Sequence, residues 1–239
     1  MEAALNGIVN FLKPPGMSSS DAVAWIRRVL GVKKAGHCGA LDPDACGVLP
    51  VCVGAATKAA GRLLESDKKY RVEAVAGLLT DTLDTSGTIL DAGPRDLPER
   101  ARFEAALGAF TGRVDQTPPM FSAVKIGGQR LYKLARKGVE IERAPRPIEI
   151  YSLDIVYYNG GRVIFDVACS KGTYVRALCR DLGERLGIYL CMSYLLRTES
   201  AGMRVADSIS ADELETRARA GTVEEILIRT ESLNIFGVL

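Results

Sequence analysis

The sequence has few of the residues that mark metal, redox or disulfide proteins. It contains one histidine, His37, and six cysteines, and no two cysteines are spaced as in a C-x-x-C motif. We therefore expect no metal site and no disulfide framework. A nucleophile formed by Cys38 with the adjacent His37 is an alternative, but adjacency in sequence does not bring two side chains together. We expect reduced thiols that act mostly as small core residues: Cys38, Cys46, Cys52, Cys169, Cys179 and Cys191.

Long apolar segments are also lacking. No run approaches the roughly 20 residues that a spanning helix needs, and the first 20 residues, MEAALNGIVNFLKPPGMSSS, lack the basic start and continuous apolar stretch of a signal peptide. We expect a soluble, cytoplasmic protein with no membrane contact.

Gly36, Gly39 and Gly47 allow close backbone approach to a ligand, but their spacing matches no phosphate-binding loop, so no nucleotide cofactor is expected.

The composition is that of an ordinary globular protein. Of the 239 residues, 47% are hydrophobic and 25% charged, which is enough to bury one large core or two small ones. The net charge is only +2, yet residues 125–146 hold seven basic residues against two acidic ones. This segment is either a polyanion-binding arm or a solvated charged helix with its loop.

Strand and helix signals alternate along the chain without a repeat. Tight hairpin signals such as Asn159-Gly160-Gly161 show that some neighbouring strands are antiparallel. The sequence therefore predicts an α+β fold: a mixed, mainly antiparallel sheet with flanking helices and an inserted basic hairpin–helix unit. In the first half of the chain, the expected elements are a strand before Pro14-Pro15-Gly16, a helix from Ser18–Ser20 to Gly31, a strand over 68–80 and a helix that starts at Pro98 and carries Phe103 to Phe110. Residues 121–135 are expected to form a strand, a turn at Gly127-Gly128 and a helix. A hairpin over 146–170, a helix over 173–187 and a helix from Ser210 to Gly221 follow.

The stretch GHCGALDPDACGVLP, residues 36–50, concentrates several reactive residue types. Asp42 lies directly before a proline, where the backbone is biased away from helix, so it belongs to a loop or turn. Asp-Pro is also a common turn signal, so these residues alone leave a structural role for Asp42 open.

This stretch, extended to GHCGALDPDACGVLPVCVGAATK, resembles the catalytic-loop signature of the TruB family of tRNA pseudouridine synthases. Four further blocks resemble family motifs in the same order, and together the five cover most of residues 7 to 200. The four are FLKPPGMSSSDAV, DKKYRVEAVAGLLTDTLDTSG, QTPPMFSAVKIGGQRLYKLARKGVEIERAPRPIEI and CSKGTYVRALCRDLGERLG.

The resemblance implies the pseudouridine synthase fold and an isomerase that needs no cofactor or metal. Such an enzyme detaches a uracil from its ribose in the T-arm of tRNA, at position 55, and rejoins it through carbon. One shielded carboxylate is enough for this chemistry, and Asp42 matches the family's catalytic aspartate. Whether it attacks the sugar, adds to the base or abstracts a ribose proton stays open. Asp44 is expected to be an ordinary loop acid.

Other family positions carry over residue by residue. Arg176 matches the arginine that pairs with the catalytic carboxylate, Tyr70 the tyrosine that stacks on the target base, and His37 the histidine that helps hold the flipped nucleotide. We expect further substrate-binding or supporting residues at Tyr174, Leu195, Lys58, Lys125, Lys13 and Asp84. The basic segment, about 120–147, matches the insertion that closes over tRNA.

The sequence departs from the family pattern in three places. Cys38 replaces a frequent threonine, the stretch CMSYLLRTESAGM keeps only Leu195 and Arg197 of the usual pattern, and the chain ends at Leu239, where many members continue into a small PUA-like RNA-binding domain. We expect residues 1–239 to form a single catalytic domain that acts as a monomer on the tRNA T-arm and requires no protein partner. The alternatives are a T-arm RNA chaperone and a guide-dependent relative that acts on other RNAs.

Overall fold

Strand β3 (Cys46–Val53) directly follows the loop that carries Asp42, and all eight of its residues are buried. The structure is a computed structural model that describes residues 5–230. By their internal contacts the residues form two compact units. Unit 1 contains residues 5–70 and 195–230 of the described chain, and unit 2 contains residues 71–194. The boundaries fall within strands β4 and β12, and each unit is described separately.

The sheet of unit 1 is built around β3. Strand β1 pairs with it antiparallel along its whole length, from Gly7↔Val53 to Lys13↔Gly47. On the other edge of β3, β2 pairs antiparallel with its second half and β12 pairs parallel with its start. The strands are β1 (Gly7–Lys13), β2 (Ala35–His37), β12 (Leu190–Ser200), β13 (Met203–Arg204) and the start of β4 (Lys68–Ala76).

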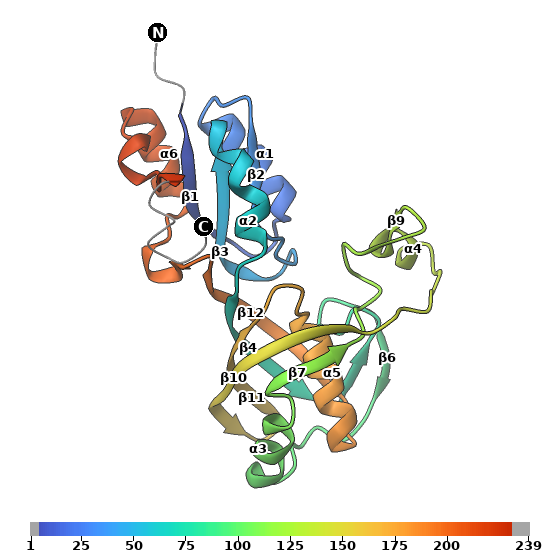
Figure 1. Ribbon diagram of the computed structural model, residues 1–239. Helices are drawn as coiled ribbons and strands as arrows, with labels where there is room; N and C mark the ends of the chain where they lie inside the picture. The colour runs from blue at the N-terminus through green and yellow to red at the C-terminus, as the bar shows by residue number, and fades with distance from the viewer. Residues whose placement is uncertain (1–4, 231–239) are drawn as a thin grey trace. The chain divides into compact units, whose positions relative to one another are not determined.

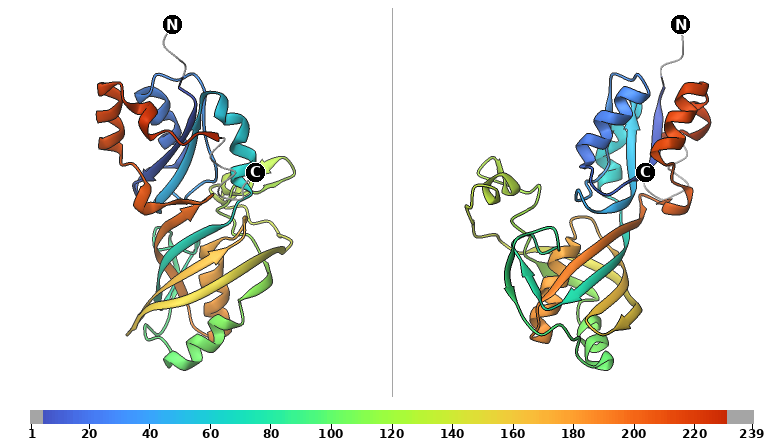
Figure 2. Two further views of the ribbon diagram at one scale, coloured as in Figure 1. Left: turned by 60° about the vertical axis from the view of Figure 1, so that its left-hand side comes forward. Right: turned by 180° about the vertical axis from the view of Figure 1, so that it is seen from behind.

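The helices of unit 1 begin and end where local signals place them. The side chain of Ser18 caps α1 (Ser19–Val29), and that of Ser210 caps α6 (Ala211–Ala220), which ends at the left-handed Gly221. Trp25 of α1 packs against Phe11 of β1 with ring centroids 5.6 Å apart. Figure 2 shows α1 and α6 beside the strands of this unit. The remaining helical segments are η1 (Gly54–Ala59), α2 (Ala60–Leu64), η2 (Val205–Asp207) and η3 (Val223–Ile226).

Unit 2 contains a sheet in the order β7-β10-β11-β4-β12 with helices on one face (Figure 1). The hairpin β10–β11 turns at Asn159↔Arg162, as the sequence predicts. Helix α5 ends at the left-handed Gly187 and contacts α3, and Phe103 of α3 meets Tyr158 edge-on at 5.3 Å. The elements are β5 (Leu78–Thr80), β6 (Ile89–Ala92), α3 (Arg100–Gly108), β7 (Gly112–Gln116), β8 (Lys125–Ile126), β9 (Gln129–Arg130), α4 (Leu131–Ala135), β10 (Arg146–Asn159), β11 (Arg162–Cys169) and α5 (Val175–Leu186).

The basic segment forms the predicted hairpin–helix unit. Lys125 of β8 pairs in register with Arg130 of β9, and α4 follows directly. Figure 1 shows this segment extending from the sheet of unit 2. Six of its seven basic side chains are exposed: Lys125, Arg130, Lys133, Arg136, Lys137 and Arg146.

The predicted α+β class is confirmed, with local differences at two elements. The strand predicted over 68–80 ends at Ala76, because Gly77 has φ +87° and Leu78 starts β5. Helix α3 begins at Arg100 rather than at Pro98 and ends at Gly108, so Phe110 lies beyond it. Among the helices of residues 5–230, none is long and apolar enough to cross a membrane.

Candidate active site

Asp42 lies in the loop between β2 and β3, as its position before Pro43 predicts. The loop closes in a turn, in which the N–H of Ala45 donates to the carbonyl of Asp42 at 3.1 Å. Asp42 is half-buried, whereas Asp44 is exposed. Of the two carboxylates beside Pro43, Asp42 is therefore the better shielded from water.

Lys13 lies at the end of β1 and is fully buried. Its ammonium donates to the carbonyls of Pro14 and Met17 at 2.7 Å and to the carbonyl of Pro43 at 3.0 Å. Burial lowers the pKa of Lys13 to about 8. The contact with Pro43 fixes the residue directly after Asp42. The expected contact of Lys13 with substrate stays a prediction.

Tyr70 and Leu195 are two further predicted residues of unit 1, and both are buried. Tyr70 lies on β4, where it shares the buried side of the strand with Val72 and Ala74. Leu195 lies on β12, one residue before the parallel pairing Leu196↔Cys46 that begins β3. Their roles at the target base stay predictions.

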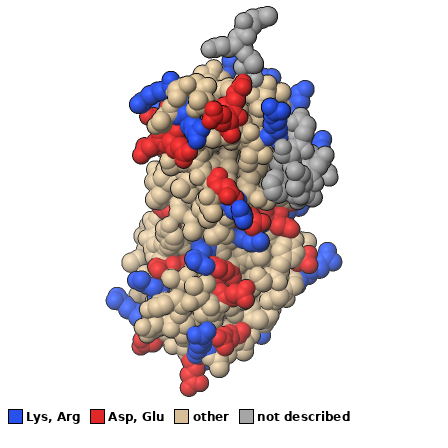
Figure 3. All heavy atoms as spheres, turned by 90° about the vertical axis from the view of Figure 1, so that its left-hand side faces the viewer, with Lys and Arg blue, Asp and Glu red and all other residues tan. Residues whose placement is uncertain are grey.

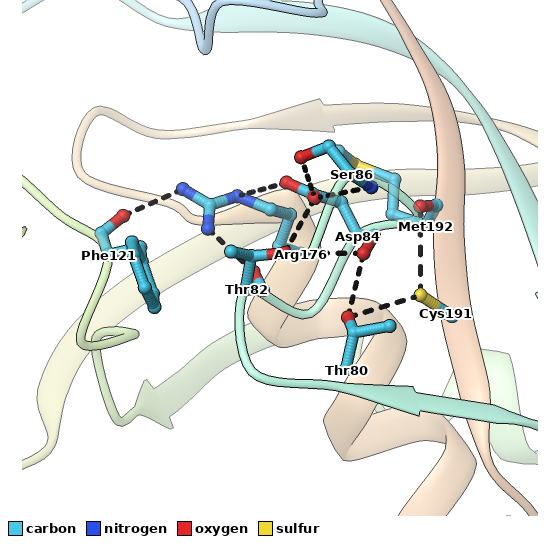
Figure 4. A network of polar contacts seen from close by, with 8 residues as sticks. All are labelled: Thr80, Thr82, Asp84, Ser86, Phe121, Arg176, Cys191 and Met192. Carbon is cyan, nitrogen blue, oxygen red and sulfur yellow. Dashed lines mark hydrogen bonds and ion pairs between the residues drawn. The ribbon is translucent and has the colours of Figure 1, made fainter. Parts of the chain in front are cut away.

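Arg176, in the first turn of α5, is buried and fixed by three groups of unit 2 (Figure 4). Its two terminal nitrogens donate to the carbonyls of Thr82 and Phe121 at 2.7 and 2.8 Å. Its Nε lies 3.6 Å from Oδ2 of Asp84. The guanidinium is thus preoriented, which a bidentate contact with a carboxylate requires. Asp42 belongs to the other unit, and its pairing with Arg176 stays a prediction.

Asp84 has a defined role that its sequence position did not reveal. Its Oδ1 accepts hydrogen bonds from Thr82 Oγ1 at 2.7 Å, from Ser86 Oγ at 2.6 Å and from the N–H of Ser86 at 3.1 Å. The other oxygen faces Arg176 (Figure 4). Leu83, the residue before it, has φ +66°, a region that leucine rarely adopts. Asp84 therefore links a strained turn to the arginine.

Tyr174 lies at the N-cap of α5 and is half-buried. Its backbone is held by Gln116, which accepts from the N–H of Tyr174 at 2.8 Å and donates to its carbonyl at 3.1 Å. This pair fixes the start of the helix that carries Arg176.

The remaining predicted residues lie in different places. His37 is half-buried on β2, in register with Val51 of β3. Lys58 is exposed on η1, and Lys125 is exposed on the basic hairpin. Their predicted contacts with RNA stay predictions.

The cysteines are core residues, as predicted. All six are buried free thiols, and the sulfurs of Cys38 and Cys52 lie 3.3 Å apart. Burial raises the pKa of the Cys179 thiol and contributes to the raised pKa of Cys52, which its hydrogen bond with Cys38 raises most. Among the predicted close-approach glycines, Gly47 meets protein backbone: a Cβ there would lie 2.2 Å from the carbonyl oxygen of Arg197.

Comparison with known proteins identifies the class of this fold and loop. A family model described as "TruB family pseudouridylate synthase (N terminal domain)" matches residues 27–175, more than half of the chain. The match includes the Asp42 loop, Tyr70, Asp84 and the basic segment, and it ends one residue before Arg176. The protein is thus a pseudouridylate synthase, an isomerase with a mixed sheet and flanking helices.

Curated relatives name the family more closely. The chain is 50% identical over 225 residues to "tRNA pseudouridine synthase B" of Alkaliphilus oremlandii, covering 94% of this chain and 74% of that protein. It is 46% identical over 234 residues to the protein of the same name from Geobacillus kaustophilus, covering 95% and 82%. The chain belongs to the TruB family.

A solved structure supports the fold. The structure titled "Crystal Structure of a Cbf5-Nop10-Gar1 Complex" matches with a TM-score of 0.76 at 29% identity, covering 95% of this chain. The match spans 61% of that structure's chain, so the solved chain is considerably longer than the part that the two proteins share.

Proposed function

We propose that this protein converts the uridine at position 55 in the T-arm of tRNA into pseudouridine, with Asp42 as the catalytic carboxylate. The observation that carries the proposal is the shielded position of Asp42 in a loop that buried side chains hold, within a chain of the TruB family. The relatives named tRNA pseudouridine synthase B support tRNA as the substrate.

The chemistry sets what the residues must do. The bond between N1 of uracil and C1′ of ribose breaks, the base turns, and a bond from its C5 to C1′ forms. C5 loses its proton in this step and the freed N1 gains one. The product is an isomer of the substrate, so the reaction needs no net oxidant and no second substrate. A carboxylate supplies a nucleophile or a base for this sequence of steps. Asp42 takes that role, by attack on the sugar, addition to the base or removal of a ribose proton.

The other residues bind and orient. In this proposal Arg176 pairs with Asp42, since its guanidinium is already fixed by Thr82 and Phe121. Tyr70 stacks on the base, and His37 helps to hold the uridine outside the T-loop. Further contacts to the nucleotide or its phosphates are assigned to Tyr174, Leu195, Lys58, Lys125 and Lys13.

The basic segment, about 120–147, is proposed to grip the tRNA backbone. Its six exposed cations are a local excess of positive charge in a chain of net charge +2. On the face that Figure 3 shows, basic and acidic side chains are interspersed. Charge alone therefore favours the basic segment over that face as the RNA contact.

We also propose that residues 1–239 act as one catalytic domain, as a monomer and without a protein partner. The chain is 45–50% identical to several proteins named tRNA pseudouridine synthase B, but only 29% identical to the matching chain of the structure titled "Crystal Structure of a Cbf5-Nop10-Gar1 Complex". The higher identity favours a chain that acts alone over an assembly like that complex. Activity of the purified chain on a bare T-arm stem-loop tests the absence of a partner.

The central test uses a T-arm stem-loop labelled with tritium at C5 of the target uridine. The wild-type chain should release the label, because C5 loses its hydrogen when it bonds to C1′. Asp42→Asn should bind the RNA and release none. Asp44→Asn is the matched control, since it removes the same charge two residues away on an exposed side chain, and it should turn over normally. Full turnover by Asp42→Asn would contradict the proposal.

A further inference from the structure

Arg197 on β12 is a fully buried cation that the mechanism above does not use. None of the ion pairs within residues 5–230 involves it. A guanidinium stays charged in proteins, so burying one among neutral groups costs free energy unless every N–H finds an acceptor. A hydrocarbon side chain would avoid this cost. The burial of Arg197 therefore has to be explained by the groups that its guanidinium binds.

The guanidinium binds three backbone carbonyls on both sides of Asp42. Its Nη2 donates to Gly39 at 3.0 Å and its Nη1 to Ala40 at 3.2 Å, while Nε donates to Val48 at 2.7 Å. Gly39 and Ala40 precede Asp42 in the loop, and Val48 lies on β3 after it. One planar group thus ties the start of the loop to the strand that follows it.

The backbone of Arg197 is itself fixed against β3. Arg197 pairs in parallel register with Gly47, and a Cβ on Gly47 would lie 2.2 Å from the Arg197 carbonyl oxygen. Only a glycine permits this approach. The position of the guanidinium relative to the loop is therefore set by the strand pairing as well as by its hydrogen bonds.

Ser19 completes the hold on the loop. Its buried hydroxyl accepts from the N–H of Leu41 at 2.8 Å and donates to the carbonyl of Leu41 at 3.1 Å. The carbonyls of three successive residues before Asp42 are thus each bound by a buried side chain. Lys13 binds the carbonyl of Pro43 directly after it.

We propose that Arg197, together with Ser19, is a positioning residue for the reaction and fixes the backbone from which Asp42 reaches the target ribose or base. The inference rests on the proposed catalytic role of Asp42. The two side chains act only through the loop and do not contact RNA. They therefore determine the rate of the chemical step and not the affinity for RNA.

The test is a comparison of kcat and of the RNA dissociation constant for Arg197→Lys, Arg197→Met and Ser19→Ala. A lysine retains the charge but cannot span three carbonyls, and a methionine fills similar space without donors. Displacement of the loop by a fraction of an ångström to 1 Å should lower kcat by about 10²-fold in both Arg197 variants. Ser19→Ala should lower kcat less, and the dissociation constant should stay unchanged in all three.

The matched control is Leu214→Ala, which removes a fully buried side chain of α6 in the same unit. It should lower the stability of the protein with no loss of kcat in the folded fraction. If Leu214→Ala lost as much kcat as the Arg197 variants, their loss would reflect only lower stability of the protein. This result would overturn the inference. If neither Arg197 variant folds, Ser19→Ala decides, because wild-type kcat in that variant overturns the inference and a loss of kcat supports it.

Asp42→Asn, measured in the same assay, separates the two proposals. If Asp42→Asn is inactive while the Arg197 and Ser19 variants keep full kcat, only the positioning role fails. If Asp42→Asn keeps full activity, the proposed catalytic role of Asp42 itself fails.

Discussion

The guanidinium of Arg176 and the carboxylate of Asp84 face each other with 3.6 Å between Nε and Oδ2, and both side chains are largely buried. The carbonyls of Thr82 and Phe121 occupy the two terminal nitrogens. Asp84 is in turn fixed by Thr82 and Ser86. This arrangement sets the direction of an arginine that we assign to the catalytic carboxylate.

We expect Asp84→Asn to lower kcat by about 10-fold to 10²-fold, because a neutral amide holds the guanidinium less firmly. The RNA dissociation constant should not change. Asp81→Asn is the control: it removes the same charge three residues away, where the Asp81 carboxylate accepts from the backbone N–H of Thr88. Equal losses in the two variants would show that the charge of the turn matters and not the contact with Arg176. Tritium release under saturating RNA measures both.

Lys13 gives a prediction on the pH dependence of stability. Its pKa is about 8 in the folded chain and 10.5 in the unfolded chain, so the unfolded chain binds more protons between these values. The contribution of Lys13 to the free energy of unfolding should therefore rise with pH, by about 1 kcal/mol for each pH unit in that interval. Below pH 8 it should be flat.

The measurement is urea unfolding of the wild type and of Lys13→Met from pH 7 to 10.5. Thiols with a raised pKa, such as Cys179, destabilise both proteins at high pH, because the unfolded chain loses those protons first. This effect cancels in the difference between the two proteins. If the difference in the free energy of unfolding between the two proteins did not change with pH, the pKa of Lys13 would be the same in the folded and the unfolded chain.

The basic hairpin gives a prediction on salt dependence. Lys125 and Arg130 are register partners on β8 and β9, and both are exposed. If each contacts one phosphate, Lys125→Ala/Arg130→Ala should reduce the slope of log affinity against log salt by about 1.5 to 2. The kcat at saturating RNA should stay the same, since neither residue is assigned to the chemistry.

The control for this prediction is Arg100→Ala/Arg219→Ala, which removes two exposed arginines that pair with Glu104 and Glu215 on their own helices. It should leave the slope unchanged. The same reduction in both double variants would assign the salt dependence to net charge. Binding titrations at several salt concentrations measure the slope.

Local structure was predictable where local sequence determines it. Ser18 and Ser210 cap their helices, Gly187 and Gly221 end theirs, and the Asn159-Gly160-Gly161 turn closes its hairpin, each through contacts within a few residues. Asp42 also lies in a loop as its proline neighbour predicts. Helix α3 begins two residues later than the sequence predicts, because Pro98 precedes the N-cap Glu99 instead of entering the helix.

The support of the site was not predictable, because it depends on residues far apart in the chain. Lys13 reaches Pro43 across 30 positions, and Arg197 reaches Gly39 across 158. A sequence does not show whether a lysine or an arginine is buried or exposed, so the sequence predicts a substrate contact for Lys13 but not its contact with Pro43. The contacts of Arg197 with the loop appear only once β12 pairs with β3.

Gly47 provides a direct test of that pairing. It has φ +111°, and a Cβ would meet the carbonyl oxygen of Arg197 at 2.2 Å and its nitrogen at 2.8 Å, both backbone atoms that cannot turn away. Gly47→Ala should therefore lower the free energy of unfolding by at least about 2 kcal/mol, through strain and the forced separation of β3 and β12.

Gly61→Ala is the matched control: its Cβ would meet no atom within 4 Å, and it lies within α2, so alanine should stabilise the protein by about 0.4 to 1 kcal/mol. Urea unfolding of both variants measures these changes. If Gly47→Ala proved as stable as the wild type, the backbones of β3 and β12 could not approach as closely as the structure places them, and the hold of Arg197 on the Asp42 loop would lose its anchor.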